Sequence, residues 1–178
     1  MNYKTNKKIL IPDYICEVIL HPLIDLDYEL ITYPVDNNFK INLDKLLYIY
    51  KETSANCLFI NHYFGQPQDI YSILEFCKSN KIILIEDNAH GFGGKYDGKL
   101  LGSFGDIGIS SPRKQLNQKC GGMLYINGNL VEPPDYLEIT RNMYSTMLLK
   151  KIYNKVRFIK RFMRKYVYNL PDYNDPLY

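Results

Sequence analysis

The fold of this chain is decided by the stretch Cys57-Leu-Phe-Ile-Asn-His-Tyr-Phe-Gly-Gln-Pro-Gln-Asp-Ile-Tyr-Ser-Ile-Leu-Glu-Phe-Cys-Lys-Ser-Asn-Lys-Ile-Ile-Leu-Ile-Glu-Asp87. Short apolar runs occupy residues 57–60 and 82–85, and apolar residues recur at spacings of three and four across residues 70–77. The short runs are typical of buried strands, and the intervening spacing is typical of a helix. The stretch therefore predicts a strand, a helix and a second strand.

The same alternation extends along most of the chain. Further short apolar runs lie at residues 9–11, 30–35, 107–109 and 123–126, and a second helical pattern covers residues 43–50. Strands that alternate with helices predict the α/β class, with a mainly parallel sheet flanked by helices. Ligands of such sheets bind beyond the carboxyl ends of the strands, where Asp87 and the pair Asn61-His62 are expected to lie.

Composition sets limits on the class of protein. The chain has 178 residues, of which 46% are hydrophobic, so it can form a domain with a sizeable core. Its net charge of +3 is too small to indicate a nucleic-acid partner, and we expect none. No apolar segment is long enough to span a membrane, and no signal peptide is recognisable. We therefore expect a soluble protein.

The four cysteines indicate the redox compartment. Cys16, Cys57, Cys77 and Cys120 are scattered and form no Cys-x-x-Cys pair. Reduced thiols, mostly in apolar surroundings, are a better interpretation than disulfides or a metal site, and we expect no bound metal. Reduced, unpaired cysteines favour a cytoplasmic location.

An acid, a pair of serines and a lysine follow one another in the second half of the pattern. Asp87 closes the apolar run, Ser110-Ser111 follows a Gly-Asp turn, and Lys114 comes shortly afterwards. Pyridoxal phosphate requires a carboxylate beside its pyridine nitrogen, a lysine amine that holds its aldehyde as a Schiff base, and hydroxyl or backbone donors for its phosphate. The sequence therefore predicts a pyridoxal-phosphate site, with Asp87 and Lys114 as its catalytic residues.

Simpler interpretations of these residues exist. An Asp at the end of a parallel strand often caps the next helix, and an isolated lysine is usually solvated. The glycines of Gly91-Phe-Gly-Gly94 suggest a dinucleotide fingerprint, but that motif requires glycine where Tyr96 stands. We therefore expect no nicotinamide site.

The C-terminal part differs in character from the rest. Residues 1–136 carry the predicted core, whereas residues 137–178 are basic and keep helical spacing of apolar residues before a proline-containing tail. This pattern predicts a basic amphipathic helix. Its apolar stripe could pack on its own domain, or its basic face could contact an anionic membrane or the phosphates of a substrate.

Several motifs in order resemble one known family. They are Asn61-His-Tyr-Phe-Gly-Gln-Pro-Gln-Asp69, Ile85-Glu-Asp-Asn-Ala-His90, Gly94-Lys-Tyr-Asp-Gly98, Gly102-Ser-Phe-Gly-Asp106, Ser110-Ser-Pro-Arg-Lys114 and Gly121-Gly122. This series is similar to that of the pyridoxal-phosphate-dependent sugar aminotransferases of the DegT/DnrJ/StrS type, which have the aspartate aminotransferase-like fold (fold type I). The likeness covers residues 9–126 and corresponds to the central part of the large, cofactor-binding domain.

The resemblance implies a role for each matching residue. Asp87 would pair with the pyridine nitrogen, His90 would lie near the cofactor ring, Ser110 or Ser111 would bind the phosphate, and Lys114 would carry the cofactor and shuttle the proton. His62 is more often a structural residue than a site residue. The resemblance also implies a homodimer.

The function implied is transfer of an amino group from an amino acid such as glutamate to a nucleotide-linked keto sugar, for surface polysaccharide or amino-sugar biosynthesis. Relative to the family pattern, we expect the large domain to be shortened at its N-terminus and the small domain to be replaced by the basic segment 137–178. A truncated, non-catalytic remnant or binding module of the same fold is the alternative. An unrelated α/β binding domain is a third possibility.

Overall fold

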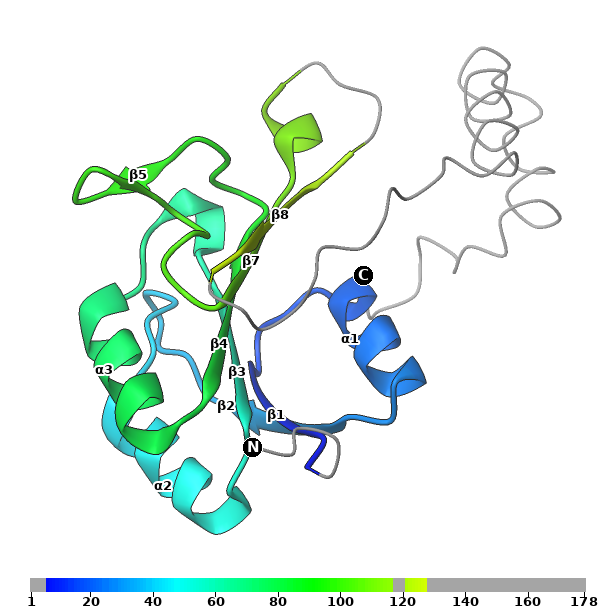
Figure 1. Ribbon diagram of the computed structural model, residues 1–178, viewed down its shortest axis with the longest axis vertical. Coiled ribbons are helices and arrows are strands. Elements are labelled where there is room, and N and C mark those ends of the chain that lie inside the picture. Colours follow the sequence, from blue (N-terminus) through cyan, green and yellow to red (C-terminus); the bar gives the residue numbers. More distant parts are fainter. Residues whose placement is uncertain (1–5, 117–120, 128–178) are drawn as a thin grey trace, which may run out of the picture. The chain divides into compact units, whose positions relative to one another are not determined.

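The structure is a computed structural model, and it describes residues 6–116 and 121–127. A six-stranded sheet with the order β2-β1-β3-β4-β7-β8 forms its centre (Figure 1). The strands are β1 (Lys8–Pro12), β2 (Glu29–Tyr33), β3 (Cys57–Asn61), β4 (Ile83–Asn88), β7 (Ile107–Ser110) and β8 (Met123–Ile126). All neighbouring pairs are parallel except β7 and β8. The mainly parallel sheet predicted from the apolar runs is therefore confirmed.

Helices cover both faces of this sheet. Helices α2 (Leu43–Thr53) and α3 (Ile70–Asn80) lie on one face, and α1 (Glu17–Asp25) lies on the other (Figure 1). The apolar spacing predicted α2 and α3 but not α1, whose nine residues include Pro22 and no buried side chain. Two short 3-10 helices, η1 (Tyr63–Gly65) and η2 (Pro112–Lys114), and a small hairpin of β5 (Lys95–Tyr96) and β6 (Lys99–Leu100) complete the described elements.

The core consists of two layers separated by the sheet. Leu10, Leu58 and Leu84 belong to the cluster that packs against α2 and α3, whereas Ile9 and Phe59 belong to the cluster on the α1 side. Successive side chains of a strand point to opposite faces, so a strand covered on both faces must be apolar throughout. This requirement explains the continuous apolar runs in the sequence.

The register brings the carboxyl ends of three strands together. Asn61 of β3 pairs with Asp87 of β4, and Asn88 of β4 pairs with Ser110 of β7. The connection that leaves β1 leads to β2, whereas the connection that leaves β3 leads to β4 on the opposite side. The carboxyl edge between β1 and β3 is therefore the topological switch point, where α/β sheets commonly bind ligands.

One glycine fixes how the loop before β7 crosses the sheet. A Cβ atom on Gly108 would lie 1.5 Å from the carbonyl oxygen of Gly102, so no other residue fits there without moving the backbone. The close approach holds residues 101–105 against the end of β4, where they donate hydrogen bonds to a buried carboxylate.

Some sequence expectations fall outside the described residues. They include the boundary at residue 136, the basic helix predicted within residues 137–178, and Cys120. Cys57 and Cys77 are buried free thiols, as expected, and burial raises the pKa of Cys77 to about 12. Cys16 is free but exposed. Within residues 6–116 and 121–127, no helix is long and apolar enough to cross a membrane.

Candidate functional site

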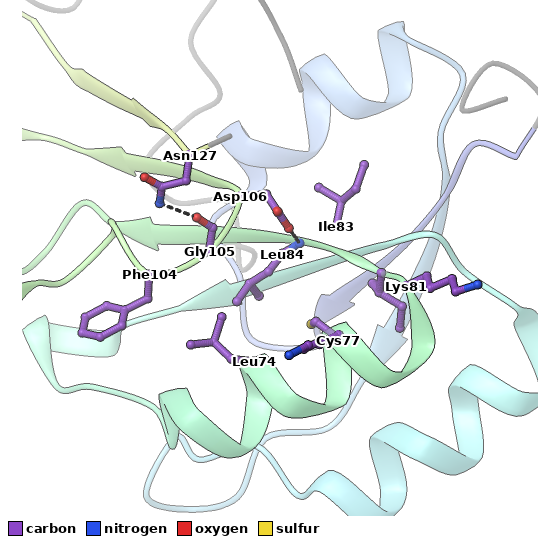
Figure 2. Close-up of a pocket in the computed structure, with 11 residues that line it drawn as sticks. Leu74, Cys77, Lys81, Ile83, Leu84, Phe104, Gly105, Asp106 and Asn127 are labelled. Atoms are coloured by element: carbon purple, nitrogen blue, oxygen red, sulfur yellow. Dashed lines mark hydrogen bonds between the residues drawn. The ribbon is translucent and has the colours of Figure 1, made fainter. Parts of the chain in front are cut away.

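A hollow lies at the amino ends of β4 and β7, opposite the edge where Asp87 lies (Figure 2). Its volume is about 460 Å³, and residues of α3 and of the loop before β7 line it, among them Leu74, Cys77 and Phe104. The Asp106 carboxylate in its wall already accepts a hydrogen bond from the backbone N–H of Leu84 at 2.8 Å. The lining is mostly apolar and offers little for catalysis, whereas the polar side chains gather at the other end of the strands.

Two acids lie near the carboxyl end of β4, and their side chains have different surroundings. Glu86 and Asp87 are consecutive, so the alternation of a strand turns them toward opposite faces of the sheet. Glu86 continues the row of Leu84 on the side of α2 and α3, and Asp87 continues the row of Ile85 on the side of α1. Each acid therefore belongs to a separate set of contacts.

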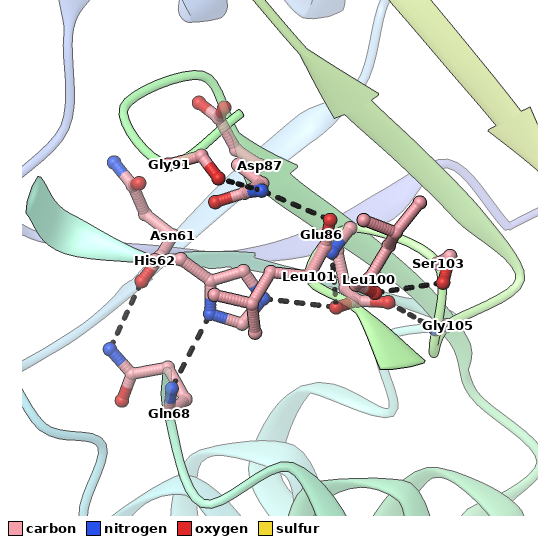
Figure 3. Close-up of polar contacts among 12 residues, drawn as sticks. Asn61, His62, Gln68, Glu86, Asp87, Gly91, Leu100, Leu101, Ser103 and Gly105 are labelled. Atoms are coloured by element: carbon pink, nitrogen blue, oxygen red, sulfur yellow. Dashed lines mark hydrogen bonds and ion pairs between the residues drawn. The ribbon is translucent and has the colours of Figure 1, made fainter. Parts of the chain in front are cut away.

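Glu86 is saturated by donors. His62 Nε2 lies 2.9 Å from its carboxylate, the backbone N–H of Gly102 donates at 3.2 Å, and the backbone N–H of Gly105 donates as well (Figure 3). The side chains of Glu86 and His62 are both 0% exposed. This pair joins the ends of β3 and β4 to the loop before β7.

His62 is held in one tautomer by this network. Its Nδ1 accepts a hydrogen bond from the backbone N–H of Gln68 at 3.3 Å, so Nε2 carries the proton and donates to Glu86. The Gln68 side chain in turn donates to the backbone carbonyls of Asn61 and Phe39 at 3.0 and 2.8 Å. Both ring nitrogens of His62 are therefore occupied in holding the loops together.

Asp87 keeps one oxygen free. Its side chain is 3% exposed, and one oxygen accepts the backbone N–H of Ala89 at 2.7 Å. Its other oxygen has no hydrogen bond within the described part of the chain. The residues after β4 form turns rather than a helix, so Asp87 does not cap a helix here.

Burial and several neighbouring groups act on the pKa of Asp87. Burial raises the pKa of its carboxyl group, while the Ala89 N–H and the nearby Lys114, His90 and His62 side chains act in the opposite direction. Lys114 is exposed at the end of η2, and Gln115, the next residue, donates from its side chain to the backbone carbonyl of His90. The fold thus brings Asp87, His90 and Lys114 into one neighbourhood.

The two candidate serines lie differently. Ser110 ends β7 beside Asn88, on the same face as Glu86, and its buried hydroxyl has no hydrogen-bond partner among the described residues. Ser111 follows it with an extended φ of −122° and is half-buried, so alternation turns it toward the face of Asp87. Of the two hydroxyls, Ser111 is better placed for a ligand that contacts Asp87.

These residues suit the groups of pyridoxal phosphate. The free oxygen of Asp87 is a buried anionic acceptor for a protonated ring nitrogen, Lys114 supplies an amine, and Ser111 supplies a hydroxyl donor.

Within residues 6–116 and 121–127, no group of three His, Cys, Asp or Glu side chains could hold a metal ion.

Sequence reasoning missed the aromatic side chains around this edge. The His90 ring stacks on Phe64 with centroids 5.9 Å apart, and Phe64 contacts Phe39, which contacts Tyr14 and Tyr63. Tyr14 and Tyr63 follow the ends of β1 and β3 closely, and that position is the signal that could have indicated them.

The chain belongs to the DegT/DnrJ/EryC1/StrS aminotransferase family, which it matches over residues 24–135. The resemblance inferred from the motifs is therefore confirmed, and the fold is aspartate aminotransferase-like.

Two curated relatives illustrate the similarity. GDP-perosamine synthase of Escherichia coli O157:H7 is 43% identical over 68 residues, which are 37% of this chain and 19% of the relative. The dTDP-4-dehydro-2,3,6-trideoxy-D-glucose 4-aminotransferase of Saccharopolyspora spinosa is 32% identical over 74 residues, covering 40% of this chain and 19% of the relative. These matches span about a fifth of the length of each relative.

Solved structures agree on the fold. The Helicobacter pylori aminotransferase PseC, involved in the biosynthesis of pseudoaminic acid, superposes with a TM-score of 0.55 at 19% identity. The superposition covers 62% of this chain and 30% of that chain.

Proposed function

We propose that this chain carries the cofactor-binding core of a pyridoxal-phosphate-dependent aminotransferase that acts on a nucleotide-linked keto sugar. The amino group would come from an amino acid such as glutamate, and the enzyme would work as a cytoplasmic homodimer. The observation that carries the proposal is Asp87, which is buried at the carboxyl edge with one oxygen free; burial raises its pKa, and Lys114 and His90 are close enough to oppose that rise.

Each residue of the site has a separate task in this proposal. When bound, pyridoxal phosphate supplies an electron sink that stabilises negative charge on the carbon next to the amine. The Asp87 carboxylate would keep the ring nitrogen protonated, and Ser111 would donate to the phosphate. Lys114 would hold the cofactor and would move a proton with its Nζ atom. His90 would orient the cofactor ring.

Labelling tests the cofactor site directly. The chain is incubated with pyridoxal phosphate, reduced with borohydride and digested, and the modified peptide is identified by mass spectrometry. We expect the label on Lys114, and we expect Lys114→Gln to abolish it while Lys99→Gln, on the exposed β6 strand, does not. A label on another lysine, or none at saturating cofactor, would contradict the site.

Turnover tests the reaction. We expect the chain to convert glutamate and a GDP- or dTDP-linked 4-keto sugar into 2-oxoglutarate and an amino sugar, because these are the linkages in the names of its relatives. Labelling of Lys114 without any turnover of these substrates would favour the non-catalytic alternative of the same fold.

A further inference from the structure

Five aromatic rings form a continuous cluster along the carboxyl edge, and the proposed cofactor chemistry uses one of them. The cluster consists of Tyr14, Phe39, Tyr63, Phe64 and His90. Centroid distances between neighbouring rings run from 5.1 Å for Phe39 and Tyr63 to 5.9 Å for Phe64 and His90. The members come from the loops after β1, β2, β3 and β4, so four segments distant in sequence meet there.

Three rings of this aromatic cluster are open to solvent. Phe64 is 64% exposed, Tyr14 is 59% exposed and His90 is exposed as well, although all three contact other rings. Phe64 and Phe39 also have left-handed backbones, with φ of 54° and 59°. This conformation is unfavourable for a bulky side chain, and such residues gather at functional sites. An exposed ring held on a strained backbone calls for an explanation other than core packing.

The aromatic cluster lies beside the candidate site. His90, one of its members, is three residues beyond Asp87 and is close enough to oppose the rise that burial causes in the pKa of that acid. Burial raises the pKa of Tyr63, and the negative charges of Asp13 and Asp87 act in the same direction. The cluster also spans the topological switch point between β1 and β3, where sheets of this kind commonly bind ligands.

We propose that Phe64 and Tyr14 form a stacking surface for the nucleobase of the substrate. This inference rests on the proposed function, because a nucleotide-linked sugar bound at Asp87 and Lys114 carries its base at the far end of the molecule. Aromatic side chains bind bases through their faces and tolerate different bases, since every base has a π-face. Phe64 and Tyr14 are uncharged aromatic rings, so these two side chains fit the base rather than the diphosphate.

Nucleotide binding to the full chain tests this surface. The probes are GDP and dTDP, with inorganic pyrophosphate as the probe that lacks a base, and dissociation constants are measured by calorimetry. We expect Phe64→Leu to weaken binding of both nucleotides at least about tenfold and to leave pyrophosphate unchanged. The matched control is Tyr48→Leu, because Tyr48 is 68% exposed on α2 and makes no ring contact among the described residues. We expect it to change nothing.

A second variant separates binding from folding. Phe64→Gly removes the ring and suits the φ of 54°, so we expect the thermal unfolding midpoint to hold while nucleotide binding falls as in Phe64→Leu. Failure of the parent chain to bind either nucleotide, equal binding by the Phe64 variants, or an equal loss in Tyr48→Leu would overturn the inference.

Two further measurements identify what has failed. A loss of dimer in sedimentation, with nucleotide binding unchanged, would show that the aromatic cluster joins two copies of the chain, and it would overturn the base-binding role. Borohydride labelling of Lys114 is measured in every variant. If Lys114 is labelled normally but GDP and dTDP bind no better than pyrophosphate, this inference alone is contradicted. If Lys114 is not labelled in the parent chain, the proposed function is contradicted.

Discussion

Glu86 and Asp87 are neighbours on one strand, both are acidic and both are buried, yet their surroundings differ completely. Glu86 accepts from His62, Gly102 and Gly105, whereas Asp87 accepts from Ala89 alone among the described residues. Two of the three histidines, His62 and His90, differ in the same way. Both ring nitrogens of His62 form buried hydrogen bonds, while the His90 ring stacks on the exposed ring of Phe64 and has no hydrogen bond among the described residues.

The difference shows how a structural acid can be told from a candidate site acid. Burial alone does not separate them, because their exposed fractions are 0% and 3%. The number of hydrogen bonds to each carboxylate does. Three donors surround Glu86, and two of them are backbone N–H groups, although the Asn88 Oδ1 and Ser110 Oγ atoms on the same face have no partner among the described residues. Asp87 accepts one backbone N–H, and its other oxygen has no hydrogen bond within the described part of the chain.

Removal of the Glu86 carboxylate should have the largest effect on the stability of the fold. Glu86→Ala leaves the His62 Nε2–H and two backbone N–H groups buried without an acceptor, so we expect the free energy of unfolding to fall by about 3–5 kcal/mol. Urea denaturation followed by circular dichroism measures it. If the Ala variant does not fold, Glu86→Gln, which keeps one acceptor, should show a smaller loss. If both variants lost less than about 1 kcal/mol of unfolding free energy, Glu86 would not be the structural acid that the comparison requires.

The histidines provide the second test. His62→Leu leaves the Glu86 carboxylate without its side-chain donor, and we expect a loss of about 2–3 kcal/mol. His90→Leu removes a ring from an exposed contact, and we expect less than about 0.5 kcal/mol. Both are measured by the same denaturation. Equal losses would mean that His90 is as structural as His62.

Much of the fold was predictable because local pattern determines it. The six apolar runs predicted the six strands of the sheet. The central strands β1, β3 and β4 are covered on both faces and leave few polar positions, whereas the edge strands β2 and β8 are partly exposed. Helices α2 and α3 followed from their spacing. Helix α1 did not, because Pro22 interrupts the pattern and none of its side chains is buried. Its position is set by packing on the sheet rather than by a local signal.

The candidate site was less predictable because it depends on contacts between distant residues. Asp87, His90 and Lys114 were expected from motif order. The pairing of Glu86 with His62, 24 positions away, depends on how β3 and β4 align, which no local pattern encodes. The choice between Ser110 and Ser111 depends on the face that each residue takes at the end of β7. Only the strand register supplies that information.

The serines therefore allow a third test, which sharpens the comparison of faces. We expect Ser111→Ala to weaken pyridoxal-phosphate binding about tenfold, because one hydrogen bond to a charged phosphate contributes about 1.5–3 kcal/mol and 1.4 kcal/mol is a factor of ten. Ser110→Ala should leave affinity unchanged, since its hydroxyl is buried on the other face. Titration of cofactor absorbance measures both variants. The reverse order of effects would place the phosphate on the side of Glu86.

The smallest effect, and the most specific to Asp87, is on stability in the absence of cofactor. Burial raises the pKa of Asp87 above its ordinary value of 3.8, so folding favours the protonated form. That contribution is fully present below the ordinary pKa and is lost as pH rises through the raised one, which leaves a buried charge that costs stability at neutral pH. Asp87→Asn has no such charge, and its amide oxygen can still accept the Ala89 N–H.

We therefore expect the cofactor-free Asn variant to unfold at higher urea concentration than the parent chain at about pH 7, with the gap closing as pH falls toward about 4. Glu75→Gln, an exposed change in the middle of α3, is the control and should show no such trend. The same Asp87→Asn variant should bind pyridoxal phosphate more weakly. If Asp87 is a site residue, its replacement should raise stability without cofactor and lower the affinity for cofactor. If Asp87→Asn lowered stability at neutral pH, the acid would be a structural residue like Glu86, and the distinction between the two faces would fail.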